Sequence, residues 1–173
     1  MKEKILVSII AGSDSDLETA NEAVKILKFF SIPHSINIAS AHRSAKHLEN
    51  CISNAVENGA QIFIAAAGMS AALPGAIAAQ TILPVIGVPI AGQSLAGLDC
   101  LLSISQMPKG VPVATMSIGK AGAVNAAVLA VQILALSDAA LREKLAAYKK
   151  SAADEVISKD LKIQIDKTGI ADG

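Results

Sequence analysis

Short apolar runs alternate with helical patterns along the whole chain. Runs rich in β-branched residues indicate strands at residues 5–10, 36–39, 62–66, 85–88 and 113–117. Such continuous runs are typical of strands that are covered on both faces, and the run at 36–39 is the weakest of them. Between the runs, apolar residues recur three and four positions apart, which predicts helices at residues 16–30, 45–58, 71–80, 98–105, 122–136 and 139–157.

Strands that alternate with helices predict a parallel sheet with right-handed crossovers and a layer of helices on each face. Five strands of this kind usually form a flavodoxin-like, doubly wound sheet, so we expect a three-layer α/β/α fold. The chain has 173 residues and no linker, repeat or low-complexity tract, which suits one domain. We expect this domain at residues 1–158, followed by a loosely ordered C-terminal tail at residues 159–173.

One predicted helix is unusual, because residues 121–136 carry no charge on any face. A helix that is apolar all round is buried all round, whereas an outer helix of a small domain normally meets water on one side. Either the C-terminal helix covers it or it lies in the core of an oligomer. We favour a homo-oligomer, because a large exposed apolar patch promotes aggregation.

Composition excludes several classes of function. Fifteen basic and fifteen acidic residues cancel, so no overall charge attracts nucleic acid or anionic lipid. Aromatic residues make up only 2% of the chain, which leaves few platforms for stacking bases. Cys51 and Cys100 lie far apart without metal-ligand spacing, and we interpret them as reduced, partly buried thiols of a cytoplasmic protein.

The uncharged stretch at residues 58–98 and a mean hydropathy of +0.49 raise the question of a membrane segment. A membrane-spanning helix needs about 20 apolar residues without a break. Glycines and prolines interrupt this stretch between Gly68 and Gly92, which indicates buried strands and short helices. The N-terminal apolar run is followed at once by Asp14 and Asp16, so it is a first strand and not a signal peptide. We expect no membrane partner.

Three predicted strand ends carry turns that suit a ligand, and the carboxyl ends of parallel strands meet at one edge of a sheet. Gly12, Ser13, Ser15 and Asp16 follow the first strand and open a helix. Glycine lets the backbone approach a ligand, and amides and hydroxyls at a helix N-terminus suit an oxyanion such as phosphate. Simple capping of the helix by Ser13 or Asp14 explains the same residues equally well.

The second turn contains Ser40, Ala41, His42 and Arg43. Arg43 offers a planar fork for phosphate, and His42 can exchange a proton near neutral pH. A solvated pair at a helix start is the alternative, but the place of the turn beside the first one favours function. The other histidines, His34 and His47, lack such neighbours.

The third turn includes Gly68, Ser70, Ala72 and Leu73 and contains no acid or base. Its small residues would let a planar ring lie against the backbone, although close packing of a helix on the sheet is the alternative. The sequence shows no nucleophile–base triad, metal cluster, Walker loop or dinucleotide-binding glycine motif.

Six segments, taken in order, resemble the PurE family of purine biosynthesis between about residues 5 and 136. They are Gly12–Asp16, Ser40–Arg43, Leu73–Gly75, Pro84–Pro89, Ser103–Val113 and Gly119–Ala127. Any one segment is weak evidence, but six in sequence are very specific. The resemblance implies a three-layer α/β/α subunit in a homo-octamer, whose central helices would account for the uncharged residues 121–136, and it implies no metal and no organic cofactor.

The resemblance also implies an enzyme acting on a small ribonucleotide. Ser13, Ser15, Ser40 and Arg43 would hold the ribose 5-phosphate, and Asp16 would suit a ribose hydroxyl because a carboxylate repels phosphate. His42 would be the general acid/base. The N5-carboxylate of an aminoimidazole ribonucleotide would leave as CO2, and C4 of the trapped ring would capture it, which is an isomerisation. Trapping CO2 requires water exclusion and tight positioning.

The third turn departs from the family's commonest pattern. The mutases of the family usually read G-G-A-A-H-L-P-G there, and Ala72 stands where their second histidine would be. The animal-type branch, a group of lyases that carboxylate the ring directly with CO2, reads G-x-S-N-x-L. Residues 68–73 lie between the two patterns. Direct carboxylation and a non-catalytic ribonucleotide-binding paralogue are therefore alternatives to the isomerase.

Overall fold

The computed structural model describes residues 4–92 and 95–168 of the chain. The chain divides into two compact units, residues 1–131 and residues 132–173, which are described in turn. Within the described residues no helix combines the length and the hydrophobicity that crossing a bilayer requires.

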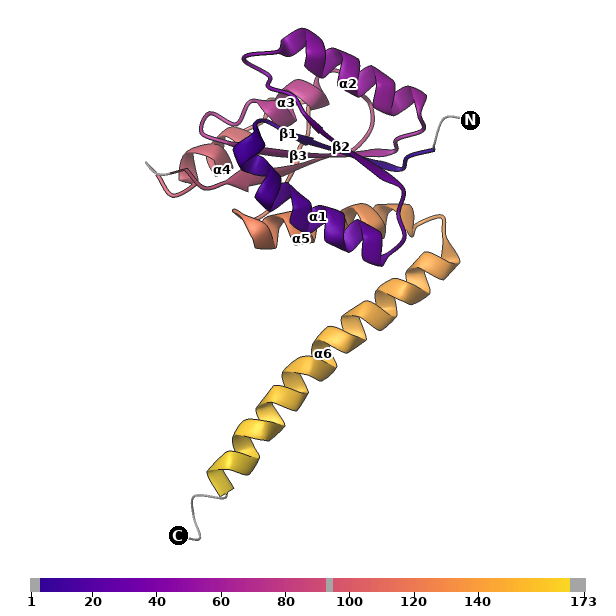
Figure 1. Cartoon of the computed structure of the whole chain (residues 1–173), viewed down its shortest axis with the longest axis vertical. Helices are drawn as coiled ribbons and strands as arrows, with labels where there is room; N and C mark the ends of the chain where they lie inside the picture. Colours follow the sequence, from indigo (N-terminus) through magenta and orange to yellow (C-terminus); the bar gives the residue numbers. More distant parts are fainter. Residues whose placement is uncertain (1–3, 93–94, 169–173) are drawn as a thin grey trace. The chain divides into compact units, whose positions relative to one another are not determined.

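A parallel sheet forms the centre of the first unit (Figure 1). The described residues contribute five strands to it in the order β2-β1-β3-β4-β5. They are β1 (Val7–Ala11), β2 (His34–Ile38), β3 (Ile62–Gly68), β4 (Val85–Ile90) and β5 (Ala114–Thr115). Each neighbouring pair is parallel. This order is that of the flavodoxin-like sheet and confirms the predicted fold class.

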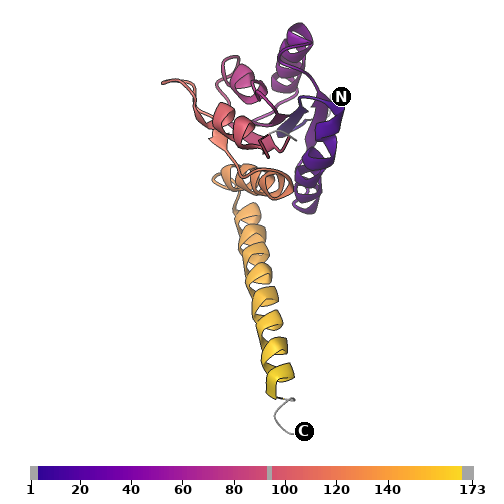
Figure 2. The same cartoon turned by 90° about the vertical axis from the view of Figure 1, so that its left-hand side faces the viewer.

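Helices cover both faces of this sheet, as Figures 1 and 2 show. The elements are η1 (Asp14–Asp16), α1 (Leu17–Phe29), α2 (Ala45–Glu57), α3 (Leu73–Ala78), α4 (Leu98–Ser105) and α5 (Lys120–Leu134). α2 and α3 lie on one face, and α1 and α5 lie on the other. Cys100 and Ile104 of α4 belong to the same core cluster as side chains of α2 and α3, so α4 covers that first face as well.

Burial along the strands explains why the sequence pattern was strong for some strands and weak for one. Every residue of β1 is buried, and so is every residue of β3 except Gly68. β2 lies at the edge of the sheet, and there Ile36 and Ile38 are exposed. An edge strand that is covered on one side does not need a continuous apolar run.

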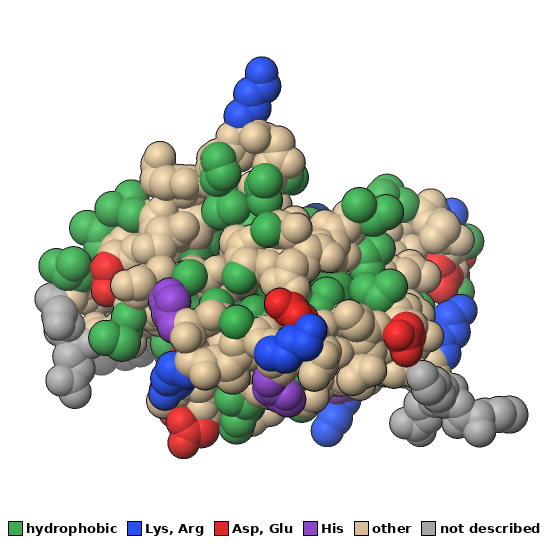
Figure 3. Space-filling model, turned by 90° about the horizontal axis from the view of Figure 1, so that it is seen from above, with side chains coloured by type: hydrophobic (Ala, Val, Ile, Leu, Met, Phe, Trp, Pro, Cys, Tyr) green, Lys and Arg blue, Asp and Glu red, His purple; other side chains and the backbone are tan. Residues whose placement is uncertain are grey.

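Apolar side chains also remain on the surface of the single chain, and Figure 3 shows many of them between the charged groups. On α5, Ala123, Ala126, Ala127 and Ala130 are fully buried. Val124 and Val128, on an adjoining side of the same helix, are only partly buried. The uncharged helix therefore has one face that the single chain leaves incompletely covered.

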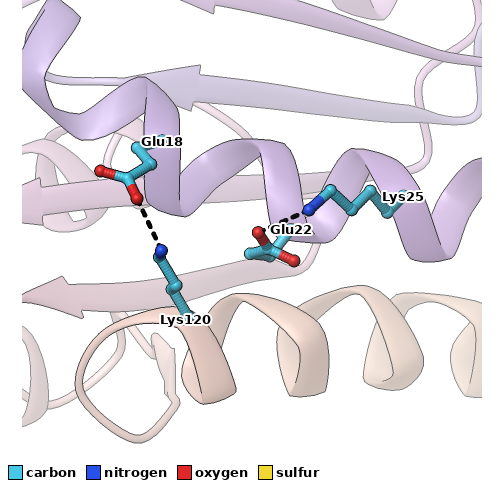
Figure 4. Close-up of polar contacts among 4 residues, drawn as sticks. All are labelled: Glu18, Glu22, Lys25 and Lys120. Carbon is cyan, nitrogen blue, oxygen red and sulfur yellow. Dashed lines mark hydrogen bonds and ion pairs between the residues drawn. The ribbon is translucent and has the colours of Figure 1, made fainter.

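An ion pair joins the two helices on one face of the sheet (Figure 4). Lys120 Nζ at the start of α5 lies 2.6 Å from Glu18 Oε1 in α1. The hydrogen bond from Lys120 lowers the pKa of Glu18, and the same bond raises the pKa of Lys120. Both side chains are well exposed, and solvent-screened pairs of this kind contribute little to stability. The pair connects two neighbouring helix ends at the surface and contributes little to the stability of the fold.

The second unit differs from the sequence expectation at its C-terminal end. Its helix α6 begins at Ala139, as predicted, but it continues beyond Ile157 to Thr168. The region expected as a loose tail is therefore helical as far as it is described, and residues 169–173 lie outside the described residues. No glycine or proline interrupts residues 139–168, and side-chain pairs one turn apart, Glu155 with Lys159 and Asp160 with Gln164, support the added turns. The single domain at residues 1–158 stays a prediction.

Gly87 in β4 offers a direct test of how closely α4 packs on the sheet. A Cβ at this position would lie 2.5 Å from Ile104 Cγ2 and 3.0 Å from Val113 Cγ1. We predict that Gly87→Ala lowers the free energy of unfolding by about 1–3 kcal/mol, the usual cost of overpacking a core. Urea denaturation at one fixed protein concentration measures this change.

Gly92→Ala is the matched control, because a Cβ at Gly92 would meet nothing within 4 Å. Its free energy of unfolding should match that of the parent chain or exceed it slightly, since alanine restricts the unfolded chain. Equal stability of the two variants would show that β4 and α4 separate easily enough to accept a methyl group.

Candidate functional site

A cavity of about 620 Å³ lies at the carboxyl ends of β1, β2, β3 and β4. Its walls come from the turns that follow these strands: residues 12–16 after β1, residues 40–43 after β2, residues 67–73 around the end of β3, and residues 90–92 at the end of β4. Since the strands are parallel and adjacent, their ends bring these distant segments to one place.

The cavity has two chemically different halves. The turns after β1 and β2 contribute hydroxyls, a carboxylate, an imidazole and a guanidinium group. The turns after β3 and β4 contribute backbone and small or apolar side chains, with Ser70 as the one hydroxyl among their described lining residues. Because β1 lies between β2 and β3, the polar half and the apolar half meet beside β1. A ligand with a charged end and a flat, weakly polar end fits this division.

The turn after β1 is held by its own side chains. Ser13 Oγ accepts a hydrogen bond from the Ser15 amide at 3.2 Å and caps η1. The two serine hydroxyls lie 2.7 Å apart, and Asp14 Oδ1 also accepts from the Ser15 amide at 3.0 Å. Ser13 therefore caps the helix, as its sequence allowed, and lines the cavity as well. Capping fixes the hydroxyls in place at a helix start, where an anion is favoured.

Arg43 connects the turn after β2 with the turn after β1. Its Nη2 donates to the Gly12 carbonyl oxygen at 3.4 Å, and its Nε donates to Ser40 Oγ at 3.4 Å. Ser40 Oγ also accepts from the Arg43 amide at 3.2 Å. These contacts hold a permanent positive charge over the polar half of the cavity while leaving the guanidinium exposed to a ligand.

Asp16 is the buried charge of the cavity, with only 7% of its surface exposed. Burial raises the pKa of its carboxyl group, and the hydrogen bond from Ser15 and the positive charge of Arg43 partly oppose this rise. Asp16 Oδ2 would lie 3.3 Å from a Cβ added at Gly12, so glycine leaves room for the carboxylate. A buried carboxylate beside a cavity is a strong acceptor for a ligand hydroxyl.

The turn after β3 shapes the apolar half and contributes no titratable side chain to it. The Ala71 amide donates to the Gly68 carbonyl oxygen at 3.0 Å and closes the turn. A Cβ at Gly68 would lie 3.1 Å from the Ile90 carbonyl oxygen, so β3 and β4 approach closely there. Ala72 is the N-cap residue of α3 and makes no capping hydrogen bond through its side chain. The turn is therefore a compact wall suited to a flat ring.

The structure brings all of the predicted site residues to this one cavity. They are Gly12, Ser13, Ser15, Asp16, Ser40, Ala41, His42, Arg43, Gly68, Ser70, Ala72 and Leu73. Their roles toward a ligand stay predictions. His42 is the one imidazole among the described lining residues. His34 instead contacts the Ile32 carbonyl oxygen at 2.7 Å, and the exposed His47 contacts Cys51 Sγ at 3.6 Å, so both lie outside the cavity.

Sequence reasoning missed the part of the wall that carries no polar side chain. The missed lining residues are Ala67, Met69, Ala71, Ile90, Ala91 and Gly92. Because they are apolar, the sequence suggests that they pack in the core. The expectation that ligands bind at the carboxyl ends of parallel strands nevertheless applied to the end of β4 as well. No group of three or more histidine, cysteine or acidic side chains with the geometry of a metal site occurs in the described part of the chain.

Comparison with known proteins agrees with this architecture. Residues 6–155 match the AIR carboxylase family. The chain is 48% identical over 151 residues to the N5-carboxyaminoimidazole ribonucleotide mutase of Escherichia coli K12, covering 87% of this chain and 89% of that protein. The mutase of Bacillus subtilis is 49% identical over 152 residues, covering 88% and 94% of the two chains.

A solved structure shows the same fold. The crystal structure of Treponema denticola PurE superposes with a TM-score of 0.82 at 32% sequence identity, covering 92% of this chain and 98% of that one. These similarities confirm the resemblance carried by the six sequence segments.

The buried carboxylate of Asp16 predicts a dependence of stability on pH. A raised pKa means that the folded chain holds this proton more tightly than the unfolded chain. The parent's stability therefore falls as the pH rises from the ordinary value of 3.8 through the raised pKa, and it stays lower above that pKa. We predict that Asp16→Asn is more stable than the parent at neutral pH without ligand, and that this advantage shrinks as the pH falls toward 3.8.

Urea denaturation over a pH series measures this advantage. Asp14→Asn removes the same charge from an exposed neighbour in the same turn and should change the stability little. A loss of stability at neutral pH in Asp16→Asn would mean that the hydrogen bond from Ser15 outweighs the cost of burying the carboxylate.

Proposed function

Because this chain belongs to the AIR carboxylase family, we propose that it is an isomerase of de novo purine biosynthesis that acts in the cytoplasm. It converts N5-carboxyaminoimidazole ribonucleotide into 4-carboxy-5-aminoimidazole ribonucleotide. The observation that carries this proposal is the identity of 48% and 49%, over most of both chains, with mutases from two distant bacteria. The divided cavity supports it, because a ribonucleotide has one anionic end and one flat end.

The polar half of the cavity holds the ribose 5-phosphate in this proposal. Ser13, Ser15 and Ser40 supply hydroxyls, and Arg43 supplies the positive charge that a phosphate needs. Asp16 accepts a hydrogen bond from a ribose hydroxyl. The imidazole ring then lies along Gly12 and Ala41 and against the apolar half, at Gly68, Ser70, Ala72 and Leu73.

His42 moves the proton in the proposed reaction. The bond between N5 and its carboxyl carbon breaks, CO2 leaves, and the nitrogen keeps the electron pair and takes a proton from His42. C4 of the ring then attacks the carbon of the trapped CO2, and His42 recovers a proton from C4. Atoms and charge balance without a metal, an oxidant or an organic cofactor, because one proton and one CO2 exchange places on the ring.

Direct carboxylation is the second candidate, and one observation favours it. The turn after β3 carries Ala72 and no titratable side chain, so the cavity offers a single imidazole among its described lining residues. One assay separates the candidates: N5-carboxyaminoimidazole ribonucleotide is supplied, or aminoimidazole ribonucleotide with bicarbonate, and the formation of the C4-carboxylate is followed. Product from the first substrate supports the isomerase, product from the second supports the carboxylase, and product from neither indicates a non-catalytic ribonucleotide-binding paralogue.

Binding and proton transfer rest on different residues, so two variants should separate them. Arg43→Ala should weaken the binding of aminoimidazole ribonucleotide by on the order of 1.5–3 kcal/mol, since it removes a charge-assisted contact with phosphate. His42→Asn should slow turnover by about 10²–10⁴-fold while its affinity stays within a few-fold of the parent. Titration calorimetry and steady-state turnover on the same protein samples measure both effects.

Two residues outside the cavity provide matched controls. Lys46→Ala removes an exposed cation of α2, and His47→Asn removes a histidine of the same helix. Neither should change affinity or turnover more than a few-fold. Unchanged affinity in Arg43→Ala would refute the phosphate site, and near-normal turnover in His42→Asn would make His42 a structural residue.

We further propose that the protein is a homo-oligomer, an octamer. α5 carries no charged residue after Lys120, and its outer face exposes part of Val124 and Val128 in the single chain. Subunits that pack these faces together would remove that apolar surface from water.

Light scattering should therefore give a mass of about eight times 17.6 kDa. Val128→Glu should break the assembly or make the protein insoluble, because an unpaired charge in a buried interface costs several kcal/mol. Gln61→Glu adds the same charge at an exposed site and should leave the mass unchanged. A monodisperse monomer at micromolar concentration would contradict the oligomer.

A further inference from the structure

Met69 is a large apolar side chain that lines the cavity and is also well exposed. It lines the apolar half of the cavity, yet 75% of its surface is exposed in the unliganded chain. A large, flexible apolar side chain at the rim of a cavity gains from being covered, and the thioether of methionine packs well against aromatic rings. The exposed side chain is thus available to a flat ligand ring in the cavity.

The backbone holds Met69 in place at an energetic cost. Its φ is 54°, and that of Ala71 in the same turn is 29°, so both lie in the left-handed region that side chains with a Cβ disfavour. Among the described residues the other non-glycine residues with positive φ are Ser31 and Ala96, and neither lines the cavity. Glycine would adopt the conformation of Met69 without this cost. Strain that persists at a cavity wall is a reason to look for a functional role of the side chain.

The division of the cavity indicates which part of a ligand Met69 meets. In the proposed binding mode the phosphate lies with Ser13, Ser15 and Arg43, and the base reaches past His42 to the turn after β3. Met69 belongs to that turn, beside the small residues that would face the ring.

We propose that Met69 closes over the imidazole ring of the bound ribonucleotide and keeps water from the CO2 that passes between N5 and C4. The inference rests on the proposed function, because Met69 would decide whether the CO2 is captured by C4 or lost to solvent. When the cover is absent, the bond from N5 to the carboxyl carbon still breaks and N5 still takes its proton. CO2 then leaves for solvent, and aminoimidazole ribonucleotide is released instead of the C4-carboxylate.

A first experiment asks whether a ribonucleotide covers Met69, whatever reaction the enzyme performs. The full-length protein is treated with dilute hydrogen peroxide with and without saturating aminoimidazole ribonucleotide, and sulfoxide formation at each methionine is followed by peptide mass spectrometry. The ligand should slow the oxidation of Met69 by about fivefold or more, since oxidation follows exposure. Met116 does not line the cavity and serves as the internal reference. Equal oxidation of Met69 with and without ligand would overturn the proposal.

A second experiment measures the shielding itself. N5-carboxyaminoimidazole ribonucleotide labelled in its carboxyl group is turned over by the parent and by Met69→Gly, and the spontaneous decay of the substrate is subtracted. Glycine adopts the left-handed conformation of residue 69 without strain, so Met69→Gly should fold. In this variant the ratio of released CO2 to labelled C4-carboxylate should rise by about fivefold or more. The affinity for aminoimidazole ribonucleotide should fall as well, because the ring loses its contact with the thioether, so the ratio is measured at saturating substrate.

Two further variants test whether the effect comes from Met69 shielding the ring or from the loss of any apolar side chain. Met69→Leu keeps an apolar side chain of similar volume and should restore most of the transfer. Ile82→Ala removes a fully exposed apolar side chain that does not line the cavity and should behave as the parent does.

The outcomes distinguish this inference from the proposed function. A parent protein that forms no C4-carboxylate contradicts the proposed function, and the oxidation experiment then decides alone whether Met69 covers a ribonucleotide. An active parent whose product ratio is unchanged in Met69→Gly overturns the shielding role, even when the ligand protects Met69 from oxidation.

Discussion

The parallel alignment of β1, β3 and β4 is the constraint on which the rest of the first unit depends. These strands are buried almost throughout, so their backbone groups must pair with one another and their direction is fixed by the crossover helices. One consequence is that the turns after β1, β2, β3 and β4 all open at the same edge. The cavity exists because of this alignment, since its walls come from segments as far apart in the chain as Gly12 and Gly92.

The turns of this cavity carry features that oppose stability. Asp16 is buried in spite of its charge, and Met69 and Ala71 hold left-handed backbone conformations without being glycines. The surrounding structure tolerates these costs because β1 and β3, which precede these turns, are buried almost throughout. Destabilising features such as buried charges and strained backbone often gather where a site must be preorganised for a ligand. Here they occur in both halves of one cavity.

The sequence predicted the strands and the site unevenly, and the reasons are physical. β1, β3 and β4 were found because strands buried on both faces leave continuous apolar runs. β5 was expected at residues 113–117 but is a strand only at Ala114–Thr115, although the Met116 amide still donates to the Gly87 carbonyl oxygen of β4. The polar wall of the cavity was visible in the sequence, whereas Met69, Ile90 and Ala91 look like core residues until the turns are placed. The length of α6 was underestimated because its last turns depend on local side-chain pairs and not on an apolar face.

By itself the sequence determined the fold class, the family and the chemistry available at the strand ends, since periodicity and motifs are local properties of the chain. Only the tertiary structure decided that Arg43 reaches the Gly12 carbonyl, that Asp16 is buried beside it, and that one wall of the cavity is apolar. Only the tertiary structure, too, revealed the left-handed backbone that exposes Met69. Burial, contact between distant segments and backbone strain arise from packing, and no local pattern of residues encodes them.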